Sequence, residues 1–251
     1  MLALGGLHDG YTNAMAHLVE NLDAPVQGIA GPWNHKYPHI TNIGPSLDYI
    51  SLALRWWDRW LKGVENGADA DSAYRAYIME SCPPDPGLTH RAGHWVAKQV
   101  WPSPEIKTLS LQMTDNGLVD PSVDTAGARF HRTVPVDLLC GEDCGEFFPF
   151  GFGPGELPDD QTADDRMSAC FDSAALEDDL DILGAPLVDI TVASDQPDGQ
   201  IVVRLCDLRP EGTSNLVSLG MLNLRHRESF ETPRDLIPGE TYTVRVRLDQ
   251  T

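Results

Sequence analysis

Two hydrophobic patterns follow one another along the chain, and the first is an alternation of strands and helices. Short apolar runs predict strands at residues 2–4, 26–31 and 74–79, and helical spacing predicts helices at 11–22 and 47–62. The order strand, helix, strand predicts a βαβ unit, which is the building block of parallel sheets. Ligands of such sheets bind beyond the carboxyl ends of the strands.

The second predicted helix has the clearer pattern. Pro45-Ser46 is a plausible start, and Gly63 is a plausible end. Its apolar side chains recur every three or four residues and form one stripe: Leu47, Ile50, Leu54, Trp57 and Leu61.

Beyond residues 101–104 the helical spacing disappears and short alternating segments begin. Strands are expected at 187–193, 201–208, 216–224 and 241–248, separated by turns rich in Pro and Gly. In the last strand one face carries the apolar side chains Tyr242, Val244, Val246 and Leu248. Strands at this spacing predict a β-sandwich or jelly roll. The expected fold class is therefore α/β plus all-β, with a first domain at 1–104, a second at 105–251, and the boundary near Pro104.

Composition narrows the possible partners. The 251 residues carry a net charge of -20, which repels phosphate backbones and anionic lipids, and no basic patch offsets it. We therefore expect no nucleic-acid or membrane partner. The apolar runs are too short to cross a bilayer, and the first residues lack a signal-peptide pattern, so we expect a cytoplasmic protein.

Cysteines and acidic clusters do not predict a metal site or a cofactor. The five cysteines are scattered, so reduced thiols are expected, although Cys140 and Cys144 could instead form a local disulfide or half of a zinc site. The acidic clusters at 159–160, 164–165 and 177–179 lack the spacing of a calcium loop and predict solvated turns.

Asp9 and His35 are the candidate catalytic residues. Asp9 follows the first predicted strand and His35 follows the second. Parallel neighbouring strands bring these two loops to one edge of the sheet, where a carboxylate can orient an imidazole. Taken alone, either residue reads more simply as a turn or loop residue. Acid before histidine is the chain order of α/β-hydrolases, in which the serine precedes both.

Several motifs resemble the cocaine esterase and X-Pro dipeptidyl-peptidase family of serine hydrolases. They are Gly5-Gly6-x-x-Asp9-Gly10, Gly31-Pro32-Trp33-x-His35, Trp57-Asp58-x-x-Leu61-Lys62-Gly63 and, near the other end, Leu236-Ile237-Pro238-Gly239-Glu240. The resemblance covers nearly the whole chain and is weaker from about residue 110 to 162. It implies the C-terminal portion of an α/β-hydrolase domain followed by a jelly-roll β-sandwich, both incomplete. It also implies that Asp9 is the triad acid, that His35 is the triad base, and that an ester or amide is cleaved through an acyl-enzyme.

The serine of such a triad is missing from the sequence. No Gly-x-Ser-x-Gly motif is present; Ser46 looks like a helix cap and Ser218 lies in a predicted strand. The resemblance therefore implies a fragment that is inactive alone. The expected partners are a small ester, amide or peptide substrate and either the missing N-terminal portion or a second copy. The alternative is a non-catalytic jelly-roll module for binding or assembly.

Three features near the candidate pair leave alternatives open. His8 stands where members of the family often carry an aromatic residue, and it could line a pocket or be a second titrating imidazole. His39 is expected to be a loop residue. The aromatic stretch 147–155 predicts an irregular loop packed by its own rings or, alternatively, a loop that faces substrate.

Overall fold

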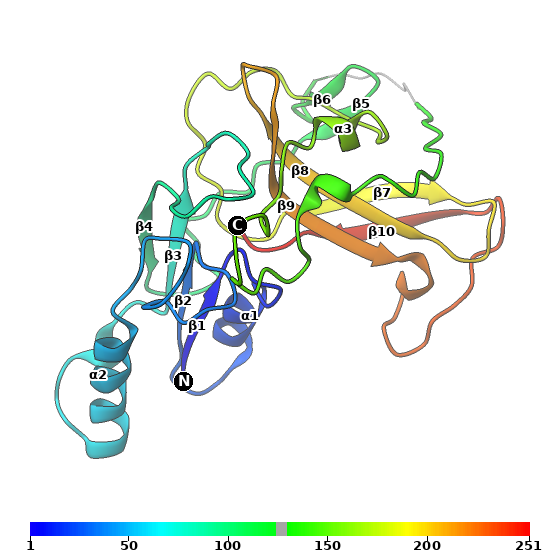
Figure 1. The fold of residues 1–251 in the computed structure, drawn as a ribbon. Coiled ribbons are helices and arrows are strands. Elements are labelled where there is room, and N and C mark those ends of the chain that lie inside the picture. Colours follow the sequence, from blue (N-terminus) through cyan, green and yellow to red (C-terminus); the bar gives the residue numbers. More distant parts are fainter. Residues whose placement is uncertain (124–129) are drawn as a thin grey trace.

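The computed structural model describes residues 1–123 and 130–251, and this part of the chain is mostly β with few helices (Figure 1). In chain order the elements are β1 (Leu2–Gly6), α1 (Ala14–Asn21), β2 (Gln27–Gly31), α2 (Tyr49–Lys62), η1 (Ala68–Ala70), β3 (Tyr74–Met79), β4 (Gly93–Lys98), β5 (Gln112–Thr114), β6 (Gly117–Val119), η2 (Glu142–Cys144), α3 (Thr162–Asp165), β7 (Leu187–Ala193), β8 (Gln200–Leu208), β9 (Ser214–Asn223), η3 (Leu224–His226) and β10 (Thr241–Arg247).

The first sheet has the strand order β1-β2-β3-β4. The β1–β2 and β2–β3 pairs are parallel, as expected for a βαβ unit, and β4 adds an antiparallel strand that the hydrophobic pattern did not predict. β4 was missed because half of its residues are exposed and none is fully buried, so it lacks the apolar run of a buried strand.

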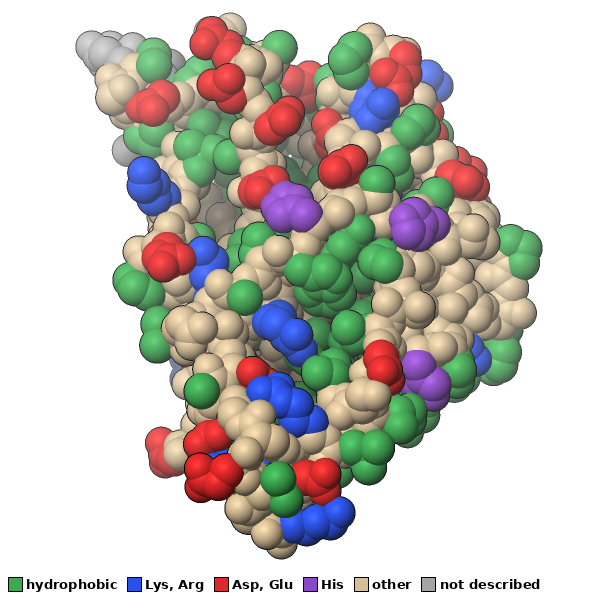
Figure 2. All heavy atoms as spheres, turned by 90° about the vertical axis from the view of Figure 1, so that its left-hand side faces the viewer, with side chains coloured by type: hydrophobic (Ala, Val, Ile, Leu, Met, Phe, Trp, Pro, Cys, Tyr) green, Lys and Arg blue, Asp and Glu red, His purple; other side chains and the backbone are tan. Residues whose placement is uncertain are grey.

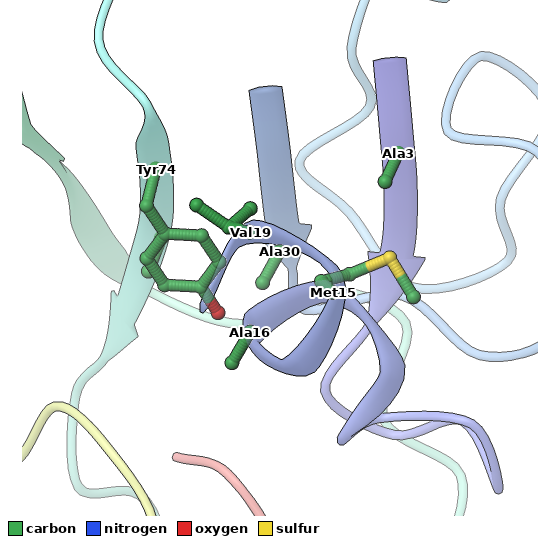
Figure 3. Close-up of a cluster of buried hydrophobic side chains, with 7 residues drawn as sticks. Ala3, Met15, Ala16, Val19, Ala30 and Tyr74 are labelled. Atoms are coloured by element: carbon green, nitrogen blue, oxygen red, sulfur yellow. The ribbon is translucent and has the colours of Figure 1, made fainter. Parts of the chain in front are cut away.

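Helix α1 packs against this sheet over small side chains (Figure 3). Ala16 is fully buried, and Ala3 and Ala30 on the strands let the helix backbone come close. Tyr74 closes the cluster, with its ring 4.4 Å from that of Trp101. This core fixes β1 and β2 side by side, and with them the two loops that follow.

The helices are shorter than the sequence predicts. α1 begins at Ala14, not residue 11, and α2 begins at Tyr49, because Asp48 rather than Ser46 caps it by accepting a hydrogen bond from Ser51 N. Gly63 ends α2 with a φ of 69°, as predicted.

The apolar stripe of α2 is largely exposed. Among its large side chains only Trp56 is buried, whereas Leu54, Trp57 and Leu61 are at least half exposed. In Figure 1 the helix projects from the molecule, and Figure 2 shows hydrophobic side chains reaching the surface on that face.

The later strands form two antiparallel pairs, β7–β10 and β8–β9. Their apolar faces share a cluster with Leu236 and Leu248. The predicted alternation in β10 is confirmed: Val244 and Val246 are buried, whereas Thr243, Arg245 and Arg247 are exposed.

The segment after β10 contacts Asn13, the residue that precedes α1. Asn13 Nδ2 donates to Asp249 Oδ1 at 2.7 Å, and Gln250 N donates to Asn13 Oδ1 at 3.0 Å. Burial raises the pKa of Asp249. The strand pairs are thus fastened to the sheet that carries Asp9 and His35.

Candidate active site

The loop after β1 carries Asp9 and is held against the loop after β2 by backbone hydrogen bonds. Leu7 N donates to Gly31 O at 2.8 Å and His8 N donates to Trp33 O at 3.0 Å. Gly6 permits this approach, because a Cβ at that position would lie 1.8 Å from Trp33 O. The glycine of the sequence motif is therefore a requirement of close backbone packing.

Trp33 fixes the second loop. Its side chain is fully buried, and its indole Nε1 donates to Pro45 O at 2.8 Å. Two residues later His35 N donates to Pro149 O at 3.0 Å, so the histidine is tied to a segment more than 100 residues further along the chain.

Asp9 and His35 meet, as the strand ends predicted. Asp9 Oδ2 lies 3.0 Å from His35 Nδ1, while Oδ1 of the same carboxylate accepts from Tyr11 N at 3.0 Å. The Asp9 side chain is 10% exposed and that of His35 is 37% exposed. A mostly buried carboxylate thus orients an imidazole that solvent and a substrate can still reach.

This arrangement can move a proton. With Nδ1 donating to the carboxylate, Nε2 is the nitrogen left to accept a proton from a hydroxyl or a water molecule, and the carboxylate stabilises the imidazolium that forms. The structure brings neither suggested serine into this role. Ser218 is buried and donates its hydroxyl to Asp249 O at 2.7 Å, and Ser46 precedes the cap of α2.

His8 is not a second base. Burial and, to a smaller extent, the charge of Arg91 lower the pKa of His8 to about 3. It therefore stays neutral near pH 7 and acts as a wall residue beside Asp9. His39 is exposed and lies near Tyr37 and Tyr49, as expected of a loop residue.

Aromatic rings surround His35, and the sequence motifs did not reveal them. Phe148 and Phe150 lie 4.6 Å and 5.0 Å from the His35 ring, and Tyr11 lies at 5.8 Å, measured between ring centroids. Phe150 also stacks on Phe152 at 4.6 Å. The stretch 147–155 therefore packs on its own rings and on the histidine. Gly10 makes room for it, since a Cβ there would lie 2.3 Å from Phe148 Cδ2.

Glu156 and Asn42 shape this aromatic loop. The Glu156 carboxylate accepts hydrogen bonds from Gly151 N at 2.6 Å and Phe152 N at 2.8 Å. Asn42 Nδ2 donates to Gly151 O at 2.5 Å, which joins the loop to the segment after β2.

The segment that follows the loop is anchored to β8 by Arg204, and this corrects the prediction for the acidic cluster at 164–165. Asp164 is only 1% exposed, lies 3.7 Å from Arg204 Nη1 and accepts a hydrogen bond from Gly141 N, so it is not in a solvated turn. Arg204 also contacts Asp165 at 2.9 Å and Gln161 at 2.9 Å. The cluster at 177–179 is exposed, as predicted.

The described residues contain no group of three or more His, Cys, Asp or Glu side chains that could hold a metal ion. All five cysteines carry free thiols, and burial raises the pKa of Cys206 to about 11. Over the described ranges 1–123 and 130–251, no helix has the length and apolar character needed to span a membrane.

Comparison with known proteins gives consistent matches. The sequence model of the X-Pro dipeptidyl-peptidase C-terminal non-catalytic domain matches residues 66–251. A Mycobacterium bovis protein named as a serine esterase is 24% identical over 95% of this chain and 38% of its own length. The cocaine esterase of a Rhodococcus species is 21% identical over 98% of this chain and 45% of its own length.

Solved structures share the fold over the whole chain. The crystal structure of an aminopeptidase from a marine sediment Thaumarchaeota archaeon matches with a TM-score of 0.70 at 20% identity, covering 100% of this chain and 44% of the other. The chain thus spans less than half the length of these relatives.

Proposed function

The chain belongs to the family of the X-Pro dipeptidyl-peptidase C-terminal non-catalytic domain, and from this we propose that it is the C-terminal part of a serine hydrolase related to cocaine esterase. The proposed substrate is a small ester, amide or X-Pro peptide. The relatives named above as esterases support the reaction class. We propose that the protein acts in the cytoplasm.

The contact between Asp9 and His35 carries this proposal. In the proposed reaction Asp9 holds the His35 ring with Nδ1 protonated, and Nε2 removes the proton of a serine hydroxyl as the oxygen attacks the carbonyl carbon. The imidazolium then protonates the leaving group, and the ring activates water to release the acyl group.

The proposal assigns the sheet of β1 to β4 to an α/β-hydrolase domain and the strand pairs β7–β10 and β8–β9 to a jelly roll, with the boundary near Pro104. The serine and the oxyanion donors would come from polypeptide outside these 251 residues. The partner would be this N-terminal portion or a second copy of the protein.

The test compares these 251 residues with the complete reading frame that encodes them. We expect a fluorophosphonate probe, which phosphonylates activated serines with loss of fluoride, to label the longer protein but not these residues alone. The longer protein should hydrolyse 4-nitrophenyl acetate or a Gly-Pro 4-nitroanilide.

Substitution of Asp9 and His35 tests their proposed catalytic roles. Replacing His35 or Asp9 by alanine should lower kcat of the longer protein by about 10⁴-fold or more, because triad members act as a unit. His39→Ala is the matched control, since this exposed histidine lies four residues away in the same loop. Full activity in folded His35→Ala protein would overturn the proposal.

A second candidate function rests on the description of the matching family as non-catalytic. On this alternative, residues 105–251 form a binding module. It would be favoured if the longer protein is neither labelled nor active but binds a glycan array, and it is rejected if the His35→Ala substitution abolishes hydrolysis.

A further inference from the structure

A cavity of about 330 Å³ lies behind the aromatic loop, between three segments of the chain. The segment after β2 contributes Asn34 and Ile43, the connection between β3 and β4 contributes Leu88, and the end of the aromatic loop contributes Glu156 and Leu157. Neither Asp9 nor His35 lines it. Its volume is in the range of small-molecule sites.

Asn34 is the unusual member of this lining. It is only 3% exposed, and its Oδ1 is buried with no hydrogen-bond partner among the described residues. A buried amide oxygen without a donor costs free energy, so native proteins rarely leave one. Asn34 lines the cavity, so a donor on a bound molecule could supply the missing hydrogen bond.

Glu156 places a second acceptor in the same cavity. Its carboxylate accepts one hydrogen bond from each of two backbone amides, Gly151 N and Phe152 N. Because a carboxylate offers about four acceptor positions, it retains capacity for a further donor. None of the described lining residues is Lys, Arg or His. The nearby Lys36 ammonium lies over the rings of Phe150 and Phe152, at 5.3 Å and 5.1 Å from their centroids, and is not part of the lining.

The remaining walls are mostly apolar, with Asn42 and Thr89 as further polar residues. Ile43, Pro86, Leu88 and Leu157 surround the two acceptors. A ligand that suits this lining has a donor-rich, positively charged end and a small hydrophobic body. An anion is disfavoured, since it would meet a carboxylate and an amide oxygen in a partly enclosed space.

We propose that this cavity is a binding site for a small primary amine, whose ammonium group donates hydrogen bonds to Asn34 Oδ1 and Glu156 while its apolar part packs against Leu88 and Leu157. The bound amine joins the segment after β2 to the loop that carries Phe150. This site does not depend on the proposed hydrolase function, because all of its residues belong to the present chain.

The experiment is a titration of the 251-residue protein with benzylamine, followed by ¹H–¹⁵N NMR and calorimetry. Three control ligands are titrated in parallel. Benzyl alcohol lacks the positive charge of benzylamine, benzoate carries a negative charge instead, and potassium chloride supplies a cation without an apolar body. We expect benzylamine to bind with a Kd on the order of a millimolar and to shift the amide signals of Gly87, Leu88 and Gly153. The other three ligands should leave these signals unchanged at the same concentration.

Two variants test the acceptors. Glu156→Gln removes the charge but keeps the side-chain shape, and it should weaken benzylamine binding about tenfold or more, because the charge-assisted hydrogen bond is lost. Asn34→Leu should also weaken binding while leaving the unliganded fold intact. Glu146→Gln is the matched control, since this exposed residue removes the same charge from the same loop without lining the cavity.

The proposal is overturned if benzylamine causes no shift at the cavity residues, which would mean that the space holds only water. It is also overturned if potassium or benzyl alcohol binds as well as the amine, or if Glu156→Gln and Glu146→Gln bind benzylamine equally.

Discussion

The ring of Phe148 lies 4.6 Å from the ring of His35, although more than 100 residues separate them in the sequence. A backbone hydrogen bond joins the same two segments, because His35 N donates to the carbonyl of Pro149, the residue after Phe148. Phe148 lies within the segment that matches a domain described as non-catalytic. That segment nevertheless forms one wall around the candidate catalytic histidine.

Removing this wall should expose the histidine. We predict that Phe148→Ala makes His35 react severalfold faster with diethyl pyrocarbonate, because the ring that packs on the imidazole is gone. Modification is followed by mass spectrometry of the His35 peptide, with His39 as the internal reference. Phe147→Ala is the control, since Phe147 is 74% exposed and should leave the rate unchanged. Equal rates in both variants would mean that the wall does not shield His35.

Gly6 should be sensitive to even the smallest side chain. Gly6→Ala would place a Cβ 1.8 Å from Trp33 O, so the two loops of the site must separate. We predict a loss of about 1–3 kcal/mol in the free energy of unfolding, measured in urea, since overpacking forces backbone shifts. At Gly199 the nearest atom to a new Cβ is at 3.5 Å, so Gly199→Ala should be nearly neutral. A neutral Gly6→Ala variant would contradict the close approach.

Patterns of neighbouring residues in the sequence predicted three features of this structure. Alternation in 241–248 predicted the buried face of β10, because a strand with one buried face has a period of two. The ends of two apolar runs predicted that Asp9 and His35 meet, because parallel neighbouring strands finish at one edge. Gly63 marked the end of α2, because a helix commonly ends at a residue with positive φ.

Contacts between distant segments were not predictable in this way. Nothing in the stretch 147–155 indicates that its rings reach His35, since that depends on how Asn42 holds the loop and on how Arg204 anchors the segment that follows it. For the same reason Asp164 was expected in solvent although it is buried against Arg204. The cavity behind the loop is likewise formed by three segments that no sequence motif links.

The Arg204 network should contribute strongly to stability. Arg204→Ala leaves Asp164 buried without its counter-charge, and the free energy of unfolding should fall by about 3–5 kcal/mol. Arg245→Ala removes an ion pair of good geometry with Asp189, but both of these side chains are more than half exposed, so its effect should be small. Urea unfolding of the two variants measures the difference, and equal effects would contradict the assigned burial.

The neutral state of His8 predicts a pH dependence. Burial lowers the pKa of His8 from 6.5 to about 3, so between these values the unfolded chain binds a proton that the folded chain does not. The stability contributed by neutral His8 is therefore fully present above pH 6.5 and declines as the pH falls toward 3. His8→Gln should be less sensitive to acid in this window, as measured by urea unfolding at several pH values. His94→Gln, at a histidine whose side chain is 52% exposed, should keep the slope of the unsubstituted protein.

The orientation of His35 by Asp9 is the central claim, and the tautomer of the His35 ring tests it most directly. Imidazole ¹⁵N chemical shifts distinguish a proton on Nδ1 from one on Nε2. We predict that neutral His35 carries its proton on Nδ1, facing the carboxylate, and that Asp9→Asn moves it to Nε2, because an amide NH₂ can donate to Nδ1. Asp23→Asn, at an exposed position, should change nothing. A proton on Nε2 in the unsubstituted protein, or the same tautomer after Asp9→Asn, would contradict the account.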